Sequence, residues 1–61
     1  PPKQVSEIQQ LLNAQGFGAG KVDGIIGADT RVATRAAQVK HGLPADGYPT
    51  ATLLAKLRGG R

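Results

Sequence analysis

Residues 22–30 read Val-Asp-Gly-Ile-Ile-Gly-Ala-Asp-Thr, and residues 45–52 repeat the pattern as Ala-Asp-Gly-Tyr-Pro-Thr-Ala-Thr. Each stretch has an Asp-Gly pair, then a Gly or Pro, then a Thr-bearing helix start. In such a turn the Asp side chain accepts backbone N–H bonds, and Gly adopts a positive φ without steric cost. The sequence therefore predicts two structural turns, formed by Asp23, Gly24, Asp46 and Gly47. Thr30 and Ala33 after the first turn match Thr52 and Ala55 after the second, which predicts two turn-to-helix units packed with pseudo-symmetry around one core.

The stretch before the first turn has the spacing of an amphipathic helix, over about residues 3–15. The apolar residues that recur at helical spacing are Val5, Ile8, Leu11 and Leu12. The polar residues predicted for the opposite, solvent side are Glu7, Gln9, Gln10 and Asn13. Gly16 suits the left-handed conformation that ends many helices, and Phe17 then folds back onto the core.

A second helix is predicted between the turns, over about residues 28–41, with Asp29 or Thr30 as its cap. Its narrow apolar stripe consists of Val32, Ala33, Ala36 and Val39. Gly42 closes it and Pro44 prevents its continuation. Ile25 and Ile26, ahead of this helix, are expected to return the chain to the core.

A third helix is predicted to begin at Pro49, which suits a first helical turn, and to run to about Arg58. Its apolar residues are Leu53, Leu54 and Leu57. The predicted fold is an all-α, compact three-helix bundle with two pseudo-repeated Asp-Gly turn-to-helix units. Residues 1–2 are expected to be the end of a linker, residues 3–58 the domain, and residues 59–61 a frayed tail.

The composition limits how this small chain is stabilised and what it binds. With 61 residues, no Cys and a single His at position 41, it must fold through packing and turn geometry alone. The formal net charge of +4 is spread along the chain. That charge favours an anionic partner such as nucleic acid, a membrane surface or a carboxylate-bearing wall polymer, but it is equally typical of an ordinary solvated surface. No apolar run is long enough to span a bilayer, and the missing initiator Met indicates a fragment of a longer protein.

The residues that could carry catalysis are few and scattered. Glu7 is the only Glu and His41 the only His, and the three Asp residues are explained by turns and a cap. Glycosidases and metal hydrolases need paired carboxylates or His clusters, so no catalytic residue, metal or cofactor is predicted. The glycine-rich stretch 18–27 lacks the Gly-Lys-Ser/Thr ending of a phosphate-binding loop.

The order and spacing of the motifs resemble the type 1 family of peptidoglycan-binding domains over nearly the whole chain. The residues that carry this resemblance are Ile8-Gln9, Leu12, Gly16, Asp23-Gly24, Gly27, Thr30, Ala33, Gln38, Gly42-Leu43, Asp46-Gly47, Thr50 and Leu53-Leu54. One departure is Ala37, where many family members have Phe, and we expect a weaker core on that face. Tyr48-Pro49 also replaces the family's usual short Gly-containing segment.

Residues 38–50 sharpen the resemblance, because they are similar to the C-terminal domain of lytic murein transglycosylases of the membrane-bound B type. The resemblance implies a non-catalytic module that tethers a cell-wall-degrading enzyme to murein in the bacterial periplasm or cell envelope. It further implies peptidoglycan, as glycan strand or stem peptide, and a catalytic domain in the same parent chain as partners. We expect a monomer that does not bind nucleic acid.

A wall ligand offers sugar rings, amides and carboxylates, which aromatic, amide and Arg side chains respectively recognise. Arg31 and Arg35 lie one turn apart on the second helix, and Gln38 follows within another turn. Together with Tyr48 at the second turn, they are the predicted ligand-binding residues. Each has a structural alternative: a solvated face for the Arg pair, a bond to the nearby turn for Gln38, and a partly buried lid for Tyr48.

Two rival functions are compatible with a small basic three-helix chain. A helix-turn-helix nucleic-acid binder would use Arg31, Arg35 and Lys40 on a recognition helix. That motif joins its helices by a turn of three or four residues, whereas the connectors of this chain are longer and rich in glycine. A docking domain for another protein of the cell envelope is the second rival.

Overall fold

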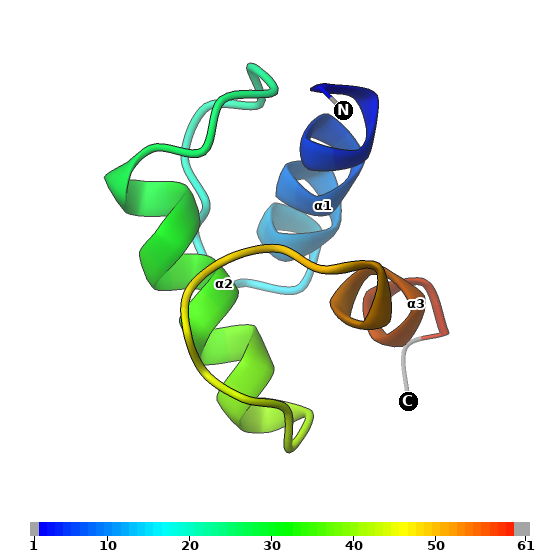
Figure 1. Ribbon diagram of the computed structural model, residues 1–61. Coiled ribbons are helices and arrows are strands. Elements are labelled where there is room, and N and C mark those ends of the chain that lie inside the picture. Colours follow the sequence, from blue (N-terminus) through cyan, green and yellow to red (C-terminus); the bar gives the residue numbers. More distant parts are fainter. Residues whose placement is uncertain (1, 60–61) are drawn as a thin grey trace.

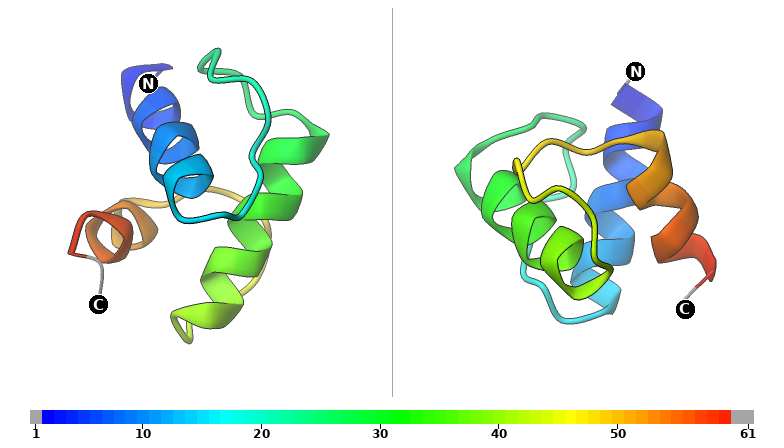
Figure 2. Two further views of the ribbon diagram at one scale, coloured as in Figure 1. Left: turned by 180° about the vertical axis from the view of Figure 1, so that it is seen from behind. Right: turned by 60° about the horizontal axis from the view of Figure 1, so that its bottom comes forward.

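Three helices joined by two long connectors form the bundle (Figure 1). The computed structural model describes residues 2–59, in which α1 is Pro2–Ala14, α2 is Ala28–Lys40 and α3 is Ala51–Gly59. The predicted all-α three-helix fold is therefore confirmed. α1 packs against both other helices. The connector 41–50 crosses from α2 to α3 over one face of the molecule (Figures 1 and 2).

The core is small and built mostly from aliphatic side chains. Its buried members are Ile8, Leu12, Ala19, Ala33, Ala37, Leu53, Leu54 and Leu57, with Leu11, Phe17 and Leu43 packed against them. Ala37 is fully buried, so the position where we expected a weaker core lies at its centre. The burial of so few large side chains is typical of a domain this short.

The first two helices end in the same way. Gly16 and Gly42 have φ values of 86° and 71°. The residues that follow them fold back, because Phe17 N–H donates to Leu12 O at 2.9 Å and Leu43 N–H donates to Gln38 O at 2.9 Å. These are Schellman motifs, which satisfy the last helical carbonyls and place an apolar residue on the core. The predicted helix ends at Gly16 and Gly42 are confirmed.

The prediction for the buried face of α2 was correct for Ala33 and wrong for the other three residues. Val32 and Val39 are 70% and 66% exposed, and Ala36 is exposed as well. The buried residues of α2 are instead Thr30, Ala33, Thr34, Ala37 and Gln38. Hydrophobicity alone did not identify this stripe, because the face that enters the core is made of small and polar residues, of which Thr30 and Gln38 hydrogen-bond to the connectors.

Several boundaries and connector residues also differ from the predictions. Ile25 and Ile26 are 66% and 39% exposed, so they do not return to the core. The residue that precedes α2 is Gly27, and no side chain caps this helix, so neither Asp29 nor Thr30 is its cap. α3 begins after Thr50, whose hydroxyl accepts from Leu53 N–H at 3.1 Å, rather than at Pro49.

α1 and α3 each extend one residue beyond the range 3–58 predicted for the domain. Pro2, predicted as linker, is the first residue of α1, and Gly59, predicted as tail, is the last residue of α3. Residue 1 and residues 60–61 lie outside the described residues. Within residues 2–59, no helix is both long and apolar enough to cross a bilayer.

The two turn-to-helix units align without a gap in the structure. Gly27 O accepts the first helical bond of α2 from Arg31 N–H, and Thr50 O accepts the first bond of α3 from Leu54 N–H, both at 3.0 Å. Gly27 and Thr50 each lie four residues after the Asp of their turn. Aligning the two helix starts therefore places Thr30 opposite Leu53. The expected match of Thr30 with Thr52 was off by one residue.

Candidate peptidoglycan-binding groove

A buried glutamine holds the first Asp-Gly turn. Gln9 is fully buried on α1 rather than on its solvent side as predicted. Its side-chain oxygen accepts from Gly24 N–H at 2.9 Å and Asp23 N–H at 3.1 Å. Its amide nitrogen donates to Ile25 O at 2.9 Å, to Thr30 Oγ1 at 2.9 Å and to Asp23 Oδ1 at 3.3 Å. One side chain thus joins α1, the turn and α2.

Gln38 does the same at the second turn. Its side-chain oxygen accepts from Gly47 N–H at 2.9 Å, and its amide nitrogen donates to Tyr48 O at 3.0 Å and Asp46 Oδ1 at 3.1 Å. Gln38 is only 2% exposed. Both ends of its amide therefore bond to the turn, as in the structural alternative named for this residue.

The carboxylates of both turns bond to the backbone two residues on. Asp23 Oδ1 accepts from Ile25 N–H, and Asp46 Oδ1 accepts from Tyr48 N–H, both at 2.9 Å. These backbone bonds, and then the Gln9 and Gln38 amides, hold the pKa of Asp23 and of Asp46 below the usual aspartate range. Gly24 and Gly47 have φ values of 74° and 81°, as the turns require.

The sequence reasoning located the turns and missed the glutamines that hold them. The internal repeat does not reveal them, because Gln9 lies fourteen residues before Asp23 whereas Gln38 lies eight residues before Asp46. A glutamine is ordinarily expected to face solvent, since burying an amide costs free energy unless all its hydrogen bonds are made. Here the turn backbone supplies those bonds.

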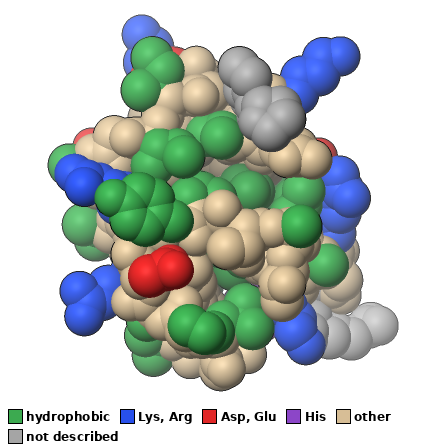
Figure 3. All heavy atoms as spheres, viewed as in Figure 1, with side chains coloured by type: hydrophobic (Ala, Val, Ile, Leu, Met, Phe, Trp, Pro, Cys, Tyr) green, Lys and Arg blue, Asp and Glu red, His purple; other side chains and the backbone are tan. Residues whose placement is uncertain are grey.

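A shallow groove of about 280 Å³ lies between α2 and the second turn. α2 contributes Arg31 and Arg35 to its lining, and the second turn contributes Asp46 and Tyr48. The full lining is Ala28, Arg31, Val32, Arg35, Asp46, Gly47 and Tyr48. Tyr48 is 55% exposed. On the face shown in Figure 3, Lys and Arg side chains project along the edge over α2, next to exposed hydrophobic side chains.

The structure therefore brings together three of the four predicted binding residues. Arg31, Arg35 and Tyr48 line one groove, whereas Gln38 lies beneath it and fixes the turn that carries Tyr48. Gly47 makes the close approach possible: a Cβ at this position would lie 3.3 Å from Arg31 O. The groove thus depends on a glycine whose backbone packs directly against α2.

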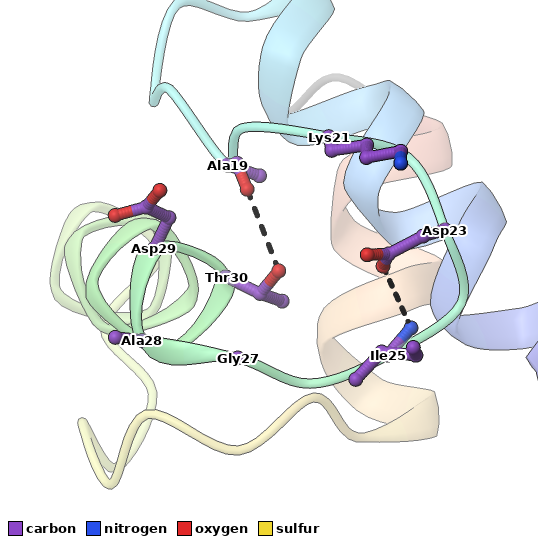
Figure 4. Close-up of a pocket in the computed structure, with 8 residues that line it drawn as sticks. All are labelled: Ala19, Lys21, Asp23, Ile25, Gly27, Ala28, Asp29 and Thr30. Carbon is purple, nitrogen blue, oxygen red and sulfur yellow. Dashed lines mark hydrogen bonds between the residues drawn. The ribbon is translucent and has the colours of Figure 1, made fainter.

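A second hollow, of about 200 Å³, lies at the first turn (Figure 4). The Asp23 carboxylate turns inwards to the Ile25 amide, and the Thr30 hydroxyl donates to Ala19 O at 3.4 Å. Asp29 extends from α2 on the opposite side (Figure 4). Its inward-facing polar groups are satisfied within the turn, so this hollow serves the fold and presents no paired cations.

The remaining charged and titratable groups form no reactive cluster in the part of the chain that the structure describes. Residues 2–59 hold no group of three or more His, Cys, Asp or Glu side chains that could bind a metal ion. Glu7 accepts two hydrogen bonds from Arg58, at 2.6 and 2.7 Å, which joins α1 to α3 on the surface. The Arg58 guanidinium lowers the pKa of Glu7.

Comparison with known proteins defines the class of protein to which this fold and groove belong. Residues 1–57 match the family model described as a peptidoglycan binding domain. The chain belongs to this peptidoglycan-binding domain family, as its motifs predicted.

Particular relatives agree with that membership. The fold superposes on SltB3 from Pseudomonas aeruginosa, crystallised in complex with NAG-anhNAM-pentapeptide, with a TM-score of 0.89 and 56% identity over 93% of this chain and 15% of SltB3. The chain is 49% identical over 45 residues to a spore cortex-lytic enzyme of Bacillus cereus, covering 74% of the chain and 17% of the enzyme. It is also 46% identical over 52 residues to the OxPP cycle protein OpcA of Nostoc punctiforme, covering 85% and 11%. The chain thus spans less than a fifth of each of these relatives.

Proposed function

We propose that this chain is the non-catalytic, wall-binding module of a larger cell-wall-degrading enzyme, a lytic murein transglycosylase of the bacterial periplasm or cell envelope. The family match and the likeness to SltB3 and to a cortex-lytic enzyme support this assignment. The module acts as a monomer that is joined to a catalytic domain in the same parent chain.

The binding site in this proposal is the groove between α2 and the second turn. Arg31 and Arg35 contact carboxylates of the wall polymer, and the Tyr48 ring packs on a sugar or methyl face. Gln38 positions Tyr48 through its bond to the Tyr48 carbonyl. The observation that carries the proposal is the convergence of two cations and one exposed aromatic in a single groove of a peptidoglycan-binding fold.

The physical role of the module is to raise the local concentration of the catalytic domain at the wall polymer. A weak site on a linked module keeps the catalytic domain near an insoluble polymer, because each dissociation is followed by rebinding to one of many repeated sites. High affinity for a single site is unnecessary for this role.

Sedimentation with purified sacculi tests the proposal. The chain is expected to pellet with sacculi, and Arg31→Ala combined with Arg35→Ala is expected to reduce the pelleted fraction about tenfold at moderate salt. The matched control is Lys3→Ala with Lys56→Ala, which removes the same charge from exposed positions outside the groove. Unchanged retention of the Arg double variant would remove the groove from the proposal, and absence of all retention would overturn the function itself.

A further inference from the structure

The groove carries charges of both signs, which a neutral sugar does not require. Arg31 and Arg35 form no ion pair within residues 2–59; the salt bridge in this part of the chain joins Glu7 and Arg58. The same groove is lined by Asp46, one of whose oxygens accepts hydrogen bonds from the Gln38 amide and from Tyr48 N–H. Its other oxygen accepts no hydrogen bond from the described residues. Two guanidiniums and one carboxylate oxygen are thus left available at one site.

The pseudo-repeat shows that these charges are not needed to build the turn. Both turns are held by equivalent hydrogen bonds: a buried glutamine donates to and accepts from the turn, and the Asp carboxylate accepts from the glutamine amide and from a backbone N–H. Arg31 and Arg35 lie seven and three residues before Gln38, whereas the same positions before Gln9 are Pro2 and Ser6. The first turn therefore forms without an Arg pair on the preceding helix.

The aromatic side chain of the second turn is likewise not needed to form the turn. Tyr48 occupies the position that Ile25 occupies in the first turn, and both are exposed, at 55% and 66%. Only the backbone of this position is used by the turn, through the carbonyl and the N–H. The side chains that distinguish the second turn from the first are accordingly free to serve a ligand.

The rest of the groove lining is apolar and contains no large side chain. It consists of Ala28, Val32 and Gly47. Such a surface accommodates a methyl group or an extended backbone, and it offers no broad aromatic platform for a sugar ring beyond Tyr48.

Resting on the function proposed above, we infer that the groove recognises the zwitterionic end of a peptidoglycan stem peptide rather than its glycan. The ligand's carboxylate is bound by Arg31 and Arg35, and the free amine of its diamino acid pairs with the outer oxygen of Asp46. Its small side chains lie on Ala28, Val32 and Gly47. The negative Asp46 disfavours a purely anionic polymer in the same groove.

Four soluble probes test this inference by calorimetry or NMR titration of the 61-residue chain. They are a stem peptide with free carboxylates and a free diamino-acid amine, the same peptide with its carboxylates amidated, the same peptide with its amine acetylated, and the NAG-NAM disaccharide without peptide. The free peptide is expected to bind; amidation is expected to weaken binding about tenfold, acetylation to weaken it about threefold, and the disaccharide to bind no more tightly than the amidated peptide. Equal binding of the free and amidated peptides, full affinity after acetylation, or tighter binding of the disaccharide would overturn the inference.

Variants separate failure of this inference from failure of the proposed function. Asp46→Asn keeps the oxygen that Tyr48 N–H and Gln38 need, and it should abolish the difference between the free and acetylated peptides while leaving the preference for free carboxylates. A persisting difference in that variant would remove Asp46 from the site. If the chain pellets with sacculi but does not discriminate among the peptides, the tethering function stands and the stem-peptide assignment fails.

Discussion

Single side chains with several hydrogen bonds each determine how the connectors of this domain are held. Gln9 and Gln38 each bond to both sides of an Asp-Gly turn, and each is buried where an aliphatic residue would ordinarily be expected. Since an unsatisfied buried amide costs roughly 1–3 kcal/mol, these glutamines favour the native turn over any turn that lacks matching donors and acceptors. They specify the connector geometry more than they add to the hydrophobic core.

The two turn carboxylates make the stability of the domain sensitive to low pH. The pKa of Asp23 and of Asp46 is lowered in the folded state, first by the backbone N–H of Ile25 or Tyr48 and then by the glutamine amide. A lowered folded-state pKa gives stability that is present above the unfolded value of about 3.9 and is lost as the pH falls through the folded value. The domain should therefore lose stability below about pH 4.

Asp23→Asn combined with Asp46→Asn tests this dependence. Asparagine retains an acceptor oxygen for the turn and removes the titrating group. The drop in urea midpoint between pH 6 and pH 2.5 is expected to be clearly smaller in the double variant than in the unmodified chain, and Glu7 contributes the same acid sensitivity to both proteins. An equal drop in both proteins would show that the turn carboxylates do not cause the acid sensitivity.

At the scale of elements, the glycines that end α1 and α2 and the apolar faces of α1 and α3 were predictable, whereas the buried face of α2 was not. Gly16 and Gly42 mark the ends of α1 and α2 as expected, because a Gly followed by an apolar residue is a local signal. The buried face of α2 was not predictable from hydrophobicity, since Val32 and Val39 lie outside and Thr34 and Gln38 lie inside. Which face enters the core depends in part on hydrogen bonds to the two connectors that flank α2, and periodicity contains no information about them.

Two glycines with similar backbone angles should respond differently to substitution. Gly42 has φ 71°, and a Cβ at this position would meet nothing within 4 Å, whereas at Gly47, with φ 81°, a Cβ would lie 3.3 Å from Arg31 O. Gly42→Ala should cost only the left-handed backbone strain, about 1 kcal/mol. Gly47→Ala adds a clash with the α2 backbone and should lower the free energy of unfolding by about 2–3 kcal/mol.

Urea denaturation of both variants provides the measurement, with Gly42→Ala as the matched control for positive φ. Equal destabilisation of the two variants would contradict the close approach of the second turn to α2. That result would also remove Gly47 from the lining of the groove.

At the scale of the whole molecule, α2 and the second turn together form a groove that is open to a ligand. The three-helix architecture and the peptidoglycan-binding family could both be predicted from the order of the motifs. The groove itself could be predicted only in part: Arg31, Arg35 and Tyr48 were chosen by residue chemistry, but Gln38 was grouped with them because helix spacing does not distinguish a surface stripe from a buried bond to the turn. Asp46 was predicted only as a turn residue, and only the structure shows that it also lines the groove.

The most direct measurement of the central claim is a ¹H–¹⁵N titration of the 61-residue chain with the soluble NAG-anhNAM-pentapeptide. The account predicts that the largest chemical-shift changes fall on Arg31, Val32, Arg35, Gly47 and Tyr48 and saturate together, with small changes elsewhere. Largest changes on the outer face of α1, at Ser6 and Gln10, or no saturable change at all, would contradict it.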